Sequence, residues 1–201
     1  KAIYNFLNLK VRKEVLFFDN LDEYNSNYLS KNKKKTLFIL ISKSGSTLET
    51  LTNIDLLKTK IKKKNTIIIC EKNKSPLANL AKQKKILHIE HRKYIGGRYS
   101  VLSEVGMLPA FLMGINIEKL KKNLLLYLKL KRNLLANNVN ELSEFYSLKK
   151  YRSLVLLNYD KRLTGFLFWL QQLLGESLGK KGKGLLPLIS LAPKDHHSLL
   201  Q

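Results

Sequence analysis

The stretch Thr36-Leu-Phe-Ile-Leu-Ile-Ser-Lys-Ser-Gly-Ser-Thr-Leu-Glu49 decides the fold of this 201-residue chain. Residues 36–42 form a continuous apolar run rich in β-forming residues, which is typical of a parallel strand buried on both faces. Apolar residues then recur at helical spacing, at Leu51, Ile54, Leu57 and Ile61. This spacing predicts a helix over residues 46–63. A buried strand that leads directly into a helix is the repeating unit of α/β proteins.

The chain on either side repeats this pattern. Residues 66–70 and 86–90 predict two more buried strands. Between them Ser75-Pro76 opens a short helix, with Ser as the N-cap and Pro at the first helical position. Upstream, residues 2–9 indicate the tail of a helix, and the apolar run Val15-Leu-Phe-Phe-Asp19 indicates a strand. The β-α-β-α-β order predicts a doubly wound parallel sheet with right-handed crossovers and helices on both faces.

The second half begins with helices and then returns to strands. Helices are predicted at residues 105–113, 117–133 and 140–149. A strand at 153–158, a helix at 162–174 and a strand at 185–189 follow. These three elements predict the start of a second α/β unit.

Composition excludes several classes of protein. Hydrophobic residues make up 44% of the chain, which suits a globular protein. The net charge is +22, but only six of the 37 basic residues are arginines and the lysines are dispersed, so we expect no nucleic-acid partner. One cysteine, Cys70, excludes an intramolecular disulfide and favours a reducing, cytoplasmic setting. No apolar run reaches the roughly 18 residues of a membrane span, so no membrane partner is expected.

The segment Ser42-Lys-Ser-Gly-Ser-Thr-Leu-Glu49 lies where a strand passes into a helix, at the carboxyl edge of the predicted sheet. Ligands bind at this edge in open α/β folds. Ser46 and Glu49 have capping-box spacing. Backbone N–H groups at a helix start favour an anion, and hydroxyl and ammonium groups come from Ser42, Lys43, Ser44 and Thr47. A phosphate site and a plain capped helix are both compatible with this segment.

The segment Ile95-Gly-Gly-Arg-Tyr-Ser-Val-Leu-Ser103 follows the third predicted strand, at the same edge. The two glycines allow a tight turn or a close approach to a ligand, and Arg98 brings a fixed cation. The alternative, Arg98 in a surface salt bridge, leaves the glycine pair unexplained.

Two later segments are less specific. Gln171-Gln-Leu-Leu-Gly-Glu-Ser-Leu-Gly-Lys-Lys-Gly-Lys-Gly184 suggests a Walker A loop, but its glycine spacing is one residue short and Lys181 replaces the Ser or Thr that holds magnesium. Ala192-Pro-Lys-Asp-His-His-Ser198 adds two histidines. None of the histidines has a recognised zinc-ligand spacing, so solvated surface histidines and no metal are expected. The four are His88, His91, His196 and His197.

These four segments, in this order, resemble the phosphoglucose isomerase family, which is built from sugar-isomerase (SIS) domains. The resemblance implies a SIS-type sheet with flavodoxin-like strand order, followed by the start of a second SIS unit. It divides the chain into a first SIS domain at 1–115 that lacks its first strand, a helical connection at 116–150, and the beginning of a second SIS domain at 151–201. The family's Gly-Gly-Ser turn and its C-terminal catalytic lysine have no counterpart here. We therefore expect an internal fragment that is poorly stable and nearly or wholly inactive alone.

The resemblance also implies roles for individual residues. The substrate phosphate is held by Ser42, Lys43, Ser44 and Thr47, and the rest of the substrate is contacted by Gly97 and Gln172. Arg98 matches the arginine that stabilises an enediolate, and Glu176 matches the general base that moves a proton between C1 and C2. His197 matches the histidine linked to ring opening, which in the family reaches the neighbouring subunit's site and implies a homodimer. The family requires no cofactor and no metal.

The implied function is reversible aldose–ketose isomerisation of glucose 6-phosphate and fructose 6-phosphate, in glycolysis and gluconeogenesis. The alternative is a non-catalytic SIS module that binds a sugar phosphate as a regulator. Such a module needs the Ser42 segment but not Arg98, Glu176 or His197. Acceptance of mannose 6-phosphate stays open.

Overall fold

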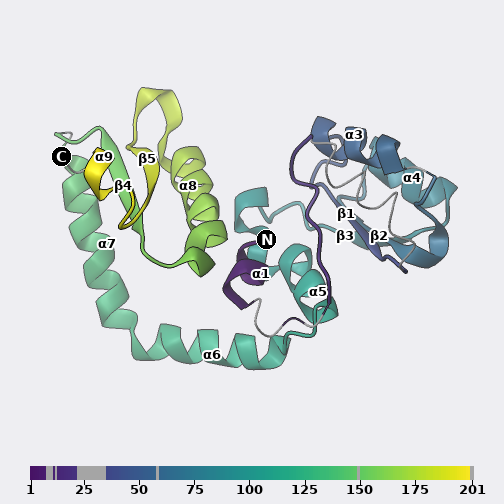
Figure 1. Ribbon diagram of the computed structural model, residues 1–201, viewed down its shortest axis with the longest axis horizontal. Helices are drawn as coiled ribbons and strands as arrows, with labels where there is room; N and C mark the ends of the chain where they lie inside the picture. The colour runs from purple at the N-terminus through teal and green to yellow at the C-terminus, as the bar shows by residue number, and fades with distance from the viewer. Residues whose placement is uncertain (8–10, 12, 22–34, 58, 149, 200–201) are drawn as a thin grey trace. The chain divides into compact units, whose positions relative to one another are not determined.

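The computed structural model describes residues 1–7, 11, 13–21, 35–57, 59–148 and 150–199. The chain forms two compact units (Figure 1). One comprises Lys13–Pro109, and the other comprises Lys1–Arg12 together with Ala110–Gln201. This division differs from the expected boundaries at 115 and 150, because the first twelve residues belong with the second half of the chain. The SIS-domain boundaries are a family assignment and stay a prediction.

The unit Lys13–Pro109 contains a parallel three-stranded sheet with the order β1-β2-β3. The strands are β1 (Phe38–Ile41), β2 (Thr66–Cys70) and β3 (Leu87–Glu90). Leu40 is opposite Ile68, and Ile68 is opposite His88. The three apolar runs thus form strands as predicted. The expected burial holds best for β2, whereas no residue of β3 is buried and Leu87 is 58% exposed, so the prediction of a buried third strand is wrong in that respect.

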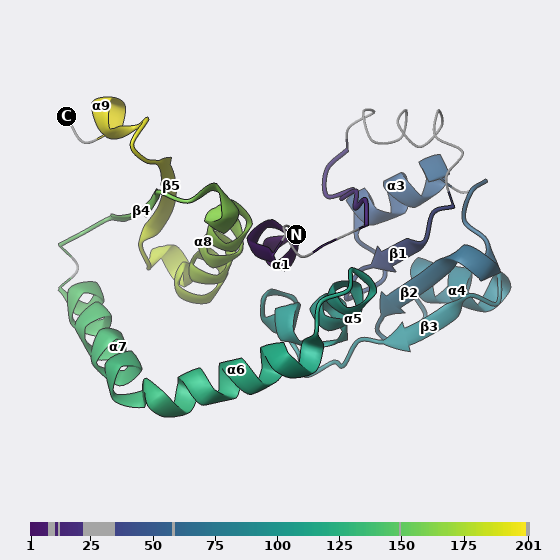
Figure 2. The ribbon, with the colours of Figure 1, turned by 60° about the horizontal axis from the view of Figure 1, so that its bottom comes forward.

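Helices follow each of these strands (Figure 2). The α-helices of this part are α3 (Leu48–Leu57), α4 (Pro76–Gln83) and α5 (Glu104–Leu112), with the short 3-10 helices η2 (Lys63–Asn65) and η3 (Gly97–Leu102). Helix α3 contacts β1, and α4 contacts β2 and β3. Ser75 caps α4 as predicted, because its Oγ accepts a hydrogen bond from the Ala78 N–H at 3.3 Å.

The core of this unit lies between the sheet and its helices. Ile68, Cys70 and Leu77 are completely buried, and Leu16 and Phe18 pack against the same cluster. The run at residues 15–19 nevertheless has no strand assignment, so the strand predicted there is wrong. A β-forming run becomes a strand only when a neighbouring strand completes its hydrogen-bond ladder, and within the described residues the sheet consists of β1, β2 and β3.

Helix α3 is shorter than the apolar spacing predicts. It begins at Leu48, so Thr47 and not Ser46 precedes it, and it ends at Leu57. In the turn that follows, the Asn65 side chain accepts from the Lys62 N–H at 2.9 Å and donates to the Lys60 carbonyl at 3.0 Å. Such side-chain bonds offer the backbone an alternative to helix. Ile61, beyond the helix, is still buried.

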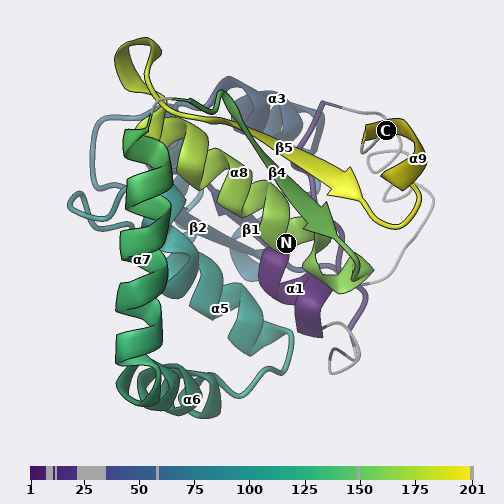
Figure 3. The same cartoon turned by 90° about the vertical axis from the view of Figure 1, so that its left-hand side faces the viewer.

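The other unit is built on a parallel pair, β4 (Ser153–Asn158) and β5 (Leu186–Leu191), joined through α8 (Thr164–Leu178) (Figure 3). The short helix α1 (Ala2–Leu7) packs against α8 at Gly165, where an added Cβ would lie 2.7 Å from Asn5 Oδ1. Both sheets are therefore parallel and flanked by helices, which confirms the α/β class.

Two long helices, α6 (Ile117–Leu130) and α7 (Arg132–Ser147), come between these parts of the sequence. Asn116 caps α6 by accepting from the Lys119 N–H at 2.8 Å. Helix α7 begins at Arg132, not at residue 140 as predicted. It follows α6 directly, with only Lys131, outside helical φ/ψ, between them. The remaining short elements are η4 (Lys161–Leu163), η5 (Lys180–Gly182) and α9 (His196–Leu199). None of the described helices has the length and apolar character needed to cross a membrane.

Candidate functional site

The loop after β1 folds around its own hydroxyl groups. Ser42 is buried, and its Oγ lies 2.7 Å from Thr47 Oγ1 and accepts from the Gly45 N–H at 3.1 Å. Ser44 Oγ accepts from the Ser46 N–H at 3.2 Å. Gly45 has a φ of +72°, a left-handed conformation that L side chains rarely adopt. The structure therefore brings together the hydroxyls of Ser42 and Thr47 in front of the start of α3.

The segment after β2 supports this loop. Asn73 Nδ2 donates to the Ser44 carbonyl at 3.0 Å, and the Leu77 N–H donates to the Gly45 carbonyl at 3.1 Å. A Cβ at Gly45 would lie only 2.2 Å from Ser75 Oγ. The loop is thus fixed from behind by the start of α4, which is the kind of preorganisation an anion site needs.

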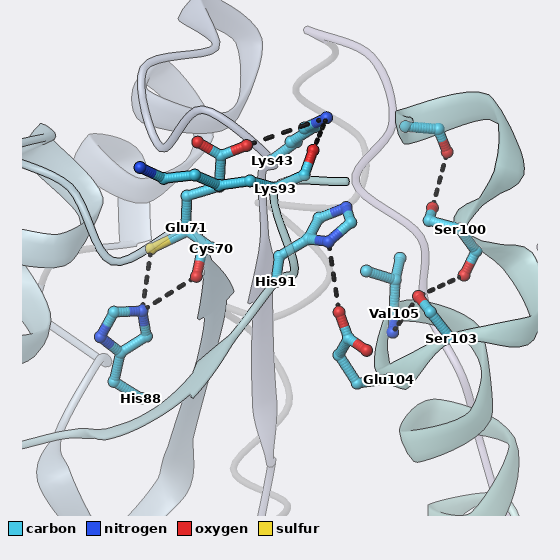
Figure 4. A network of polar contacts seen from close by, with 11 residues as sticks. Lys43, Cys70, Glu71, His88, His91, Lys93, Ser100, Ser103, Glu104 and Val105 are labelled. Atoms are coloured by element: carbon cyan, nitrogen blue, oxygen red, sulfur yellow. Dashed lines mark hydrogen bonds and ion pairs between the residues drawn. The ribbon is translucent and has the colours of Figure 1, made fainter. Parts of the chain in front are cut away.

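Lys43 connects the carboxyl ends of all three strands (Figure 4). It follows β1, its Nζ lies 3.8 Å from Glu71 Oε1 just after β2, and it donates to the Lys93 carbonyl beyond β3 at 3.2 Å. The Lys43 side chain stays about one-third exposed, at 35%. Its ammonium group is therefore held at the sheet edge, where it can also meet an anion.

The glycine–arginine segment forms the 3-10 helix η3 beyond β3. The Arg98 guanidinium lies over the Tyr99 ring, 5.1 Å from its centroid. Ser100 is buried and its Oγ donates to the Gly97 carbonyl at 2.6 Å. A Cβ at Gly97 would meet nothing within 4 Å, so the space beside Gly97 is open. The phosphate loop candidate and the arginine segment thus lie at one edge of one sheet.

The histidine at the end of β3 corrects one expectation. His91 is buried, with 1% of its side chain exposed, and its Nδ1 lies 3.2 Å from Glu104 Oε1. It is therefore not a solvated surface histidine. His88 also has specific partners, since its Nε2 lies 3.2 Å from Cys70 Sγ and 3.1 Å from the Cys70 carbonyl oxygen. Burial raises the pKa of the Cys70 thiol, and Glu71 adds to this effect while Ser75 opposes it.

The other predicted catalytic residues lie in the unit formed by Lys1–Arg12 and Ala110–Gln201. Gln172 and Glu176 are one turn apart on α8, and Gln172 Nε2 donates to Glu176 Oε1 at 2.8 Å. His197 is exposed on α9. Its neighbour His196 bonds to Tyr159, with Nε2 and Oη 2.9 Å apart. Within the described residues, no group of three or more His, Cys, Asp and Glu side chains is arranged to hold a metal ion.

Sequence reasoning missed the residues that brace the two loops. Glu71, the Lys93 carbonyl and the His91–Glu104 pair were not singled out. Glu71 directly follows a predicted strand, so its place at the carboxyl edge could have been anticipated. The His91–Glu104 contact joins residues thirteen positions apart around a bend, and no sequence pattern signals it.

The structure thus shows an α/β protein with hydroxyl groups and a lysine side chain gathered at the carboxyl ends of a parallel sheet. Comparison with known proteins makes this more specific. The chain belongs to the phosphoglucose isomerase family, whose model matches residues 3–184. This range includes both loops and the Gln172–Glu176 pair.

Individual relatives agree. The glucose-6-phosphate isomerase of Methanocaldococcus jannaschii is 34% identical over 195 residues, which cover 92% of this chain and 49% of that protein. The enzyme of the same name from Acholeplasma laidlawii is also 34% identical and covers 100% of this chain and 52% of its own length. The crystal structure of hypothetical protein TT0462 from Thermus thermophilus superposes with a TM-score of 0.80 at 25% identity, covering 98% of this chain and 51% of that one. The chain therefore spans about half the length of the curated relatives it matches.

Proposed function

We propose that this chain carries the phosphate site, the enediolate-stabilising arginine and the general base of a glucose-6-phosphate isomerase. The reaction is the reversible conversion of glucose 6-phosphate to fructose 6-phosphate, in glycolysis and gluconeogenesis. The observation that carries the proposal is the family match, which extends over both loops and over α8. Its relatives are named for this activity.

The proposed mechanism assigns one task to each loop. The hydroxyls of Ser42, Ser44 and Thr47, with the Lys43 ammonium group, hold the phosphate away from the reacting carbons. That contact keeps the substrate in register without taking part in the chemistry. Arg98 offers positive charge to the oxyanion that develops when a proton leaves the carbon next to the carbonyl. Gly97 leaves open space for the substrate beside it.

Glu176 is the proposed base. A carboxylate that abstracts a proton must keep a fixed orientation, and the 2.8 Å bond from Gln172 Nε2 supplies it by engaging Oε1. Gln172 also contacts the substrate in this proposal. The protonated Glu176 then returns its proton to the adjacent carbon while the hydroxyl proton on O2 passes to O1, so a hydrogen moves between C1 and C2 with no cofactor or metal.

The finer architecture is also proposed from the family. The sheet of the first SIS domain, residues 1–115, has a doubly wound, flavodoxin-like order, and residues 151–201 begin a second SIS domain after the connection at 116–150. His197 acts in ring opening across the interface of a homodimer. The reaction takes place in the cytoplasm.

Deuterium incorporation tests the chemistry. Fructose 6-phosphate is incubated with the chain at high concentration in heavy water, because exchange detects proton transfer even when net turnover is slow. We expect incorporation that Glu176→Gln abolishes while the affinity for fructose 6-phosphate stays within about twofold. Glu141→Gln, which removes an exposed carboxylate from α7, serves as the matched control and keeps full exchange.

The contrary results are equally specific. Exchange that survives Glu176→Gln removes Glu176 from the role of base. Binding of fructose 6-phosphate without any exchange in the wild-type chain shows either a catalytically incomplete fragment or a non-catalytic sugar-phosphate module.

A further inference from the structure

The segment between β3 and α5 must be held in place for Arg98 to have a defined position. Residues 92–103 include the adjacent glycines Gly96 and Gly97 and the exposed tyrosines Tyr94 and Tyr99. Glycines lose more conformational freedom on ordering than other residues do. The contacts that fix the two ends of this segment therefore decide where the guanidinium lies.

His91 and Glu104 join those two ends (Figure 4). The His91 N–H donates to the Cys70 carbonyl at 2.9 Å, so its backbone is bonded to the end of β2. Its imidazole is 1% exposed, and Nδ1 lies 3.2 Å from Oε1 of Glu104, the first residue of α5. The separation is that of an ion pair, although neither ring nitrogen meets the full geometry of a hydrogen bond with any described residue.

A chain of short contacts leads from this pair to Arg98. Ser103, next to Glu104, donates through Oγ to the Ser100 carbonyl at 2.7 Å. Ser100 in turn donates to the carbonyl of Gly97 at 2.6 Å, and Gly97 directly precedes Arg98. The start of α5 and the turn that presents the guanidinium thus form one connected unit.

The His91 side chain is 1% exposed and the Glu104 side chain 24% exposed, so placing the imidazole beside the carboxylate costs desolvation free energy that apolar packing would not. Desolvation of an imidazole and a carboxylate offsets much of their attraction, and apolar side chains of similar size would stabilise the fold as well. Apolar contacts are not directional, whereas a buried polar pair fixes orientation. The pair is therefore best explained by the position it imposes on the segment.

We propose that His91 and Glu104 are positioning residues that hold Arg98 against negative charge at the C1–C2 end of a phosphorylated sugar. The inference rests on the proposed function of Arg98 and adds the two residues that act through it. Neither residue touches the ligand. Their effect is confined to the charge near Arg98 and does not extend to the phosphate held by the Ser42 loop.

Two probes separate these effects in the complete 201-residue chain. The first is 6-phosphogluconate, which carries a carboxylate at C1, and the second is glucitol 6-phosphate, which has the same phosphate and no carboxylate. Isothermal titration gives the ratio of their dissociation constants. We expect the wild-type chain to prefer 6-phosphogluconate by about tenfold or more, as a charge-assisted contact allows. Arg98→Ala abolishes the preference.

Glu104→Gln is nearly isosteric and is expected to lower the preference about tenfold, with glucitol 6-phosphate binding unchanged. His91→Leu gives the same result, and His91→Gln, which keeps an N–H donor, restores most of the preference. In the Arg98→Ala background Glu104→Gln has no further effect, because the two act as one unit. Glu90→Gln is the matched control, since it removes a partly exposed carboxylate, paired with Lys72, from the end of β3.

The outcomes are distinguishable. A wild-type chain with no preference refutes the role of Arg98 and this inference with it. If Arg98→Ala removes the preference but Glu104→Gln keeps it, the role of Arg98 is supported and the positioning role of His91 and Glu104 is overturned. Equal weakening of both probes by Glu104→Gln shows a merely structural contact and also overturns it.

Discussion

Gly45→Ala is expected to destabilise the unit Lys13–Pro109 by about 3 kcal/mol. The φ of +72° at Gly45 costs a residue with a Cβ roughly 1–2 kcal/mol. The added methyl group would also lie 2.2 Å from Ser75 Oγ and 2.8 Å from Ser75 Cβ, closer than real Cβ atoms approach. Overpacking of this kind costs about 1–3 kcal/mol. The two effects act on the same turn, so their sum falls near the stated value.

Urea unfolding followed by circular dichroism measures the loss. Gly182→Ala, in the other unit, gives the conformational cost for comparison, because Gly182 has a similar φ of +69° with nothing within 4 Å of the added Cβ. It should cost only the conformational part, about 1 kcal/mol. In the Gly45→Ala background, Ser75→Gly should remove the clash with the new methyl group and recover that part of the lost stability. The loss of the Ser75 N-cap itself costs only about a few tenths of a kcal/mol when glycine replaces it.

Equal losses in Gly45→Ala and Gly182→Ala would refute the assigned contact with Ser75. A loss from Gly45→Ala that Ser75→Gly does not relieve would do the same. Ligand binding to the Ser42 loop offers a second readout, because the Gly45 N–H donates to Ser42 Oγ at 3.1 Å. We expect Gly45→Ala to weaken binding of glucitol 6-phosphate at urea concentrations where the variant is still folded.

Three further predictions concern stability and ionisation. Ile68→Ala empties a completely buried site in β2 and should cost about 3 kcal/mol by urea unfolding; a loss below about 1 kcal/mol would contradict the position of the core. Burial raises the pKa of the Cys70 thiol, so the folded state binds its proton more tightly than the unfolded state does. This favours folding below the unfolded-state pKa and is lost as pH rises through the raised, folded-state pKa. Iodoacetamide should therefore label the native chain at least about tenfold more slowly than the urea-unfolded chain, and equal rates would be inconsistent with burial. Arg162 lowers the pKa of Asp160, so this pair favours folding above the usual aspartate pKa and loses its effect as pH falls through the lowered value. An NMR titration should show the Asp160 pKa rising in Arg162→Ala, and an unchanged value would exclude the pair in solution.

The strands could be predicted from sequence because their physical signature is local. Residues 66–70 and 153–158 form β2 and β4 with the bounds that their apolar runs indicate. Helix ends were less predictable, since α3 ends at Leu57 although the apolar spacing continues to Ile61. The run at Val15 failed for a different reason: strand formation depends on a neighbouring ladder that its own sequence does not specify.

The site was predictable to the extent that topology determines it. Consecutive parallel strands place their carboxyl ends at one edge, and this alone brings the Ser42 loop and the Arg98 segment together. The bracing contacts depend on the three-dimensional path of the chain. Lys43 meets a carbonyl fifty residues away, and His91 meets Glu104 across a 3-10 turn. Neither contact leaves a periodic signal in the sequence.

The strand order β1-β2-β3 also sets the distance between the Ser42 loop and the Arg98 segment. One complete strand, β2, lies between the strand that precedes the hydroxyl loop and the strand that precedes Arg98. Adjacent strands are about 4.8 Å apart, so the two loops start about 10 Å from each other. A ligand held by its phosphate at one loop must extend over two strand spacings before its far end meets the other. The strand spacing therefore favours ligands long enough to reach both loops. We expect a preference for open-chain six-carbon sugar phosphates over three-carbon ones, which would contact only one loop.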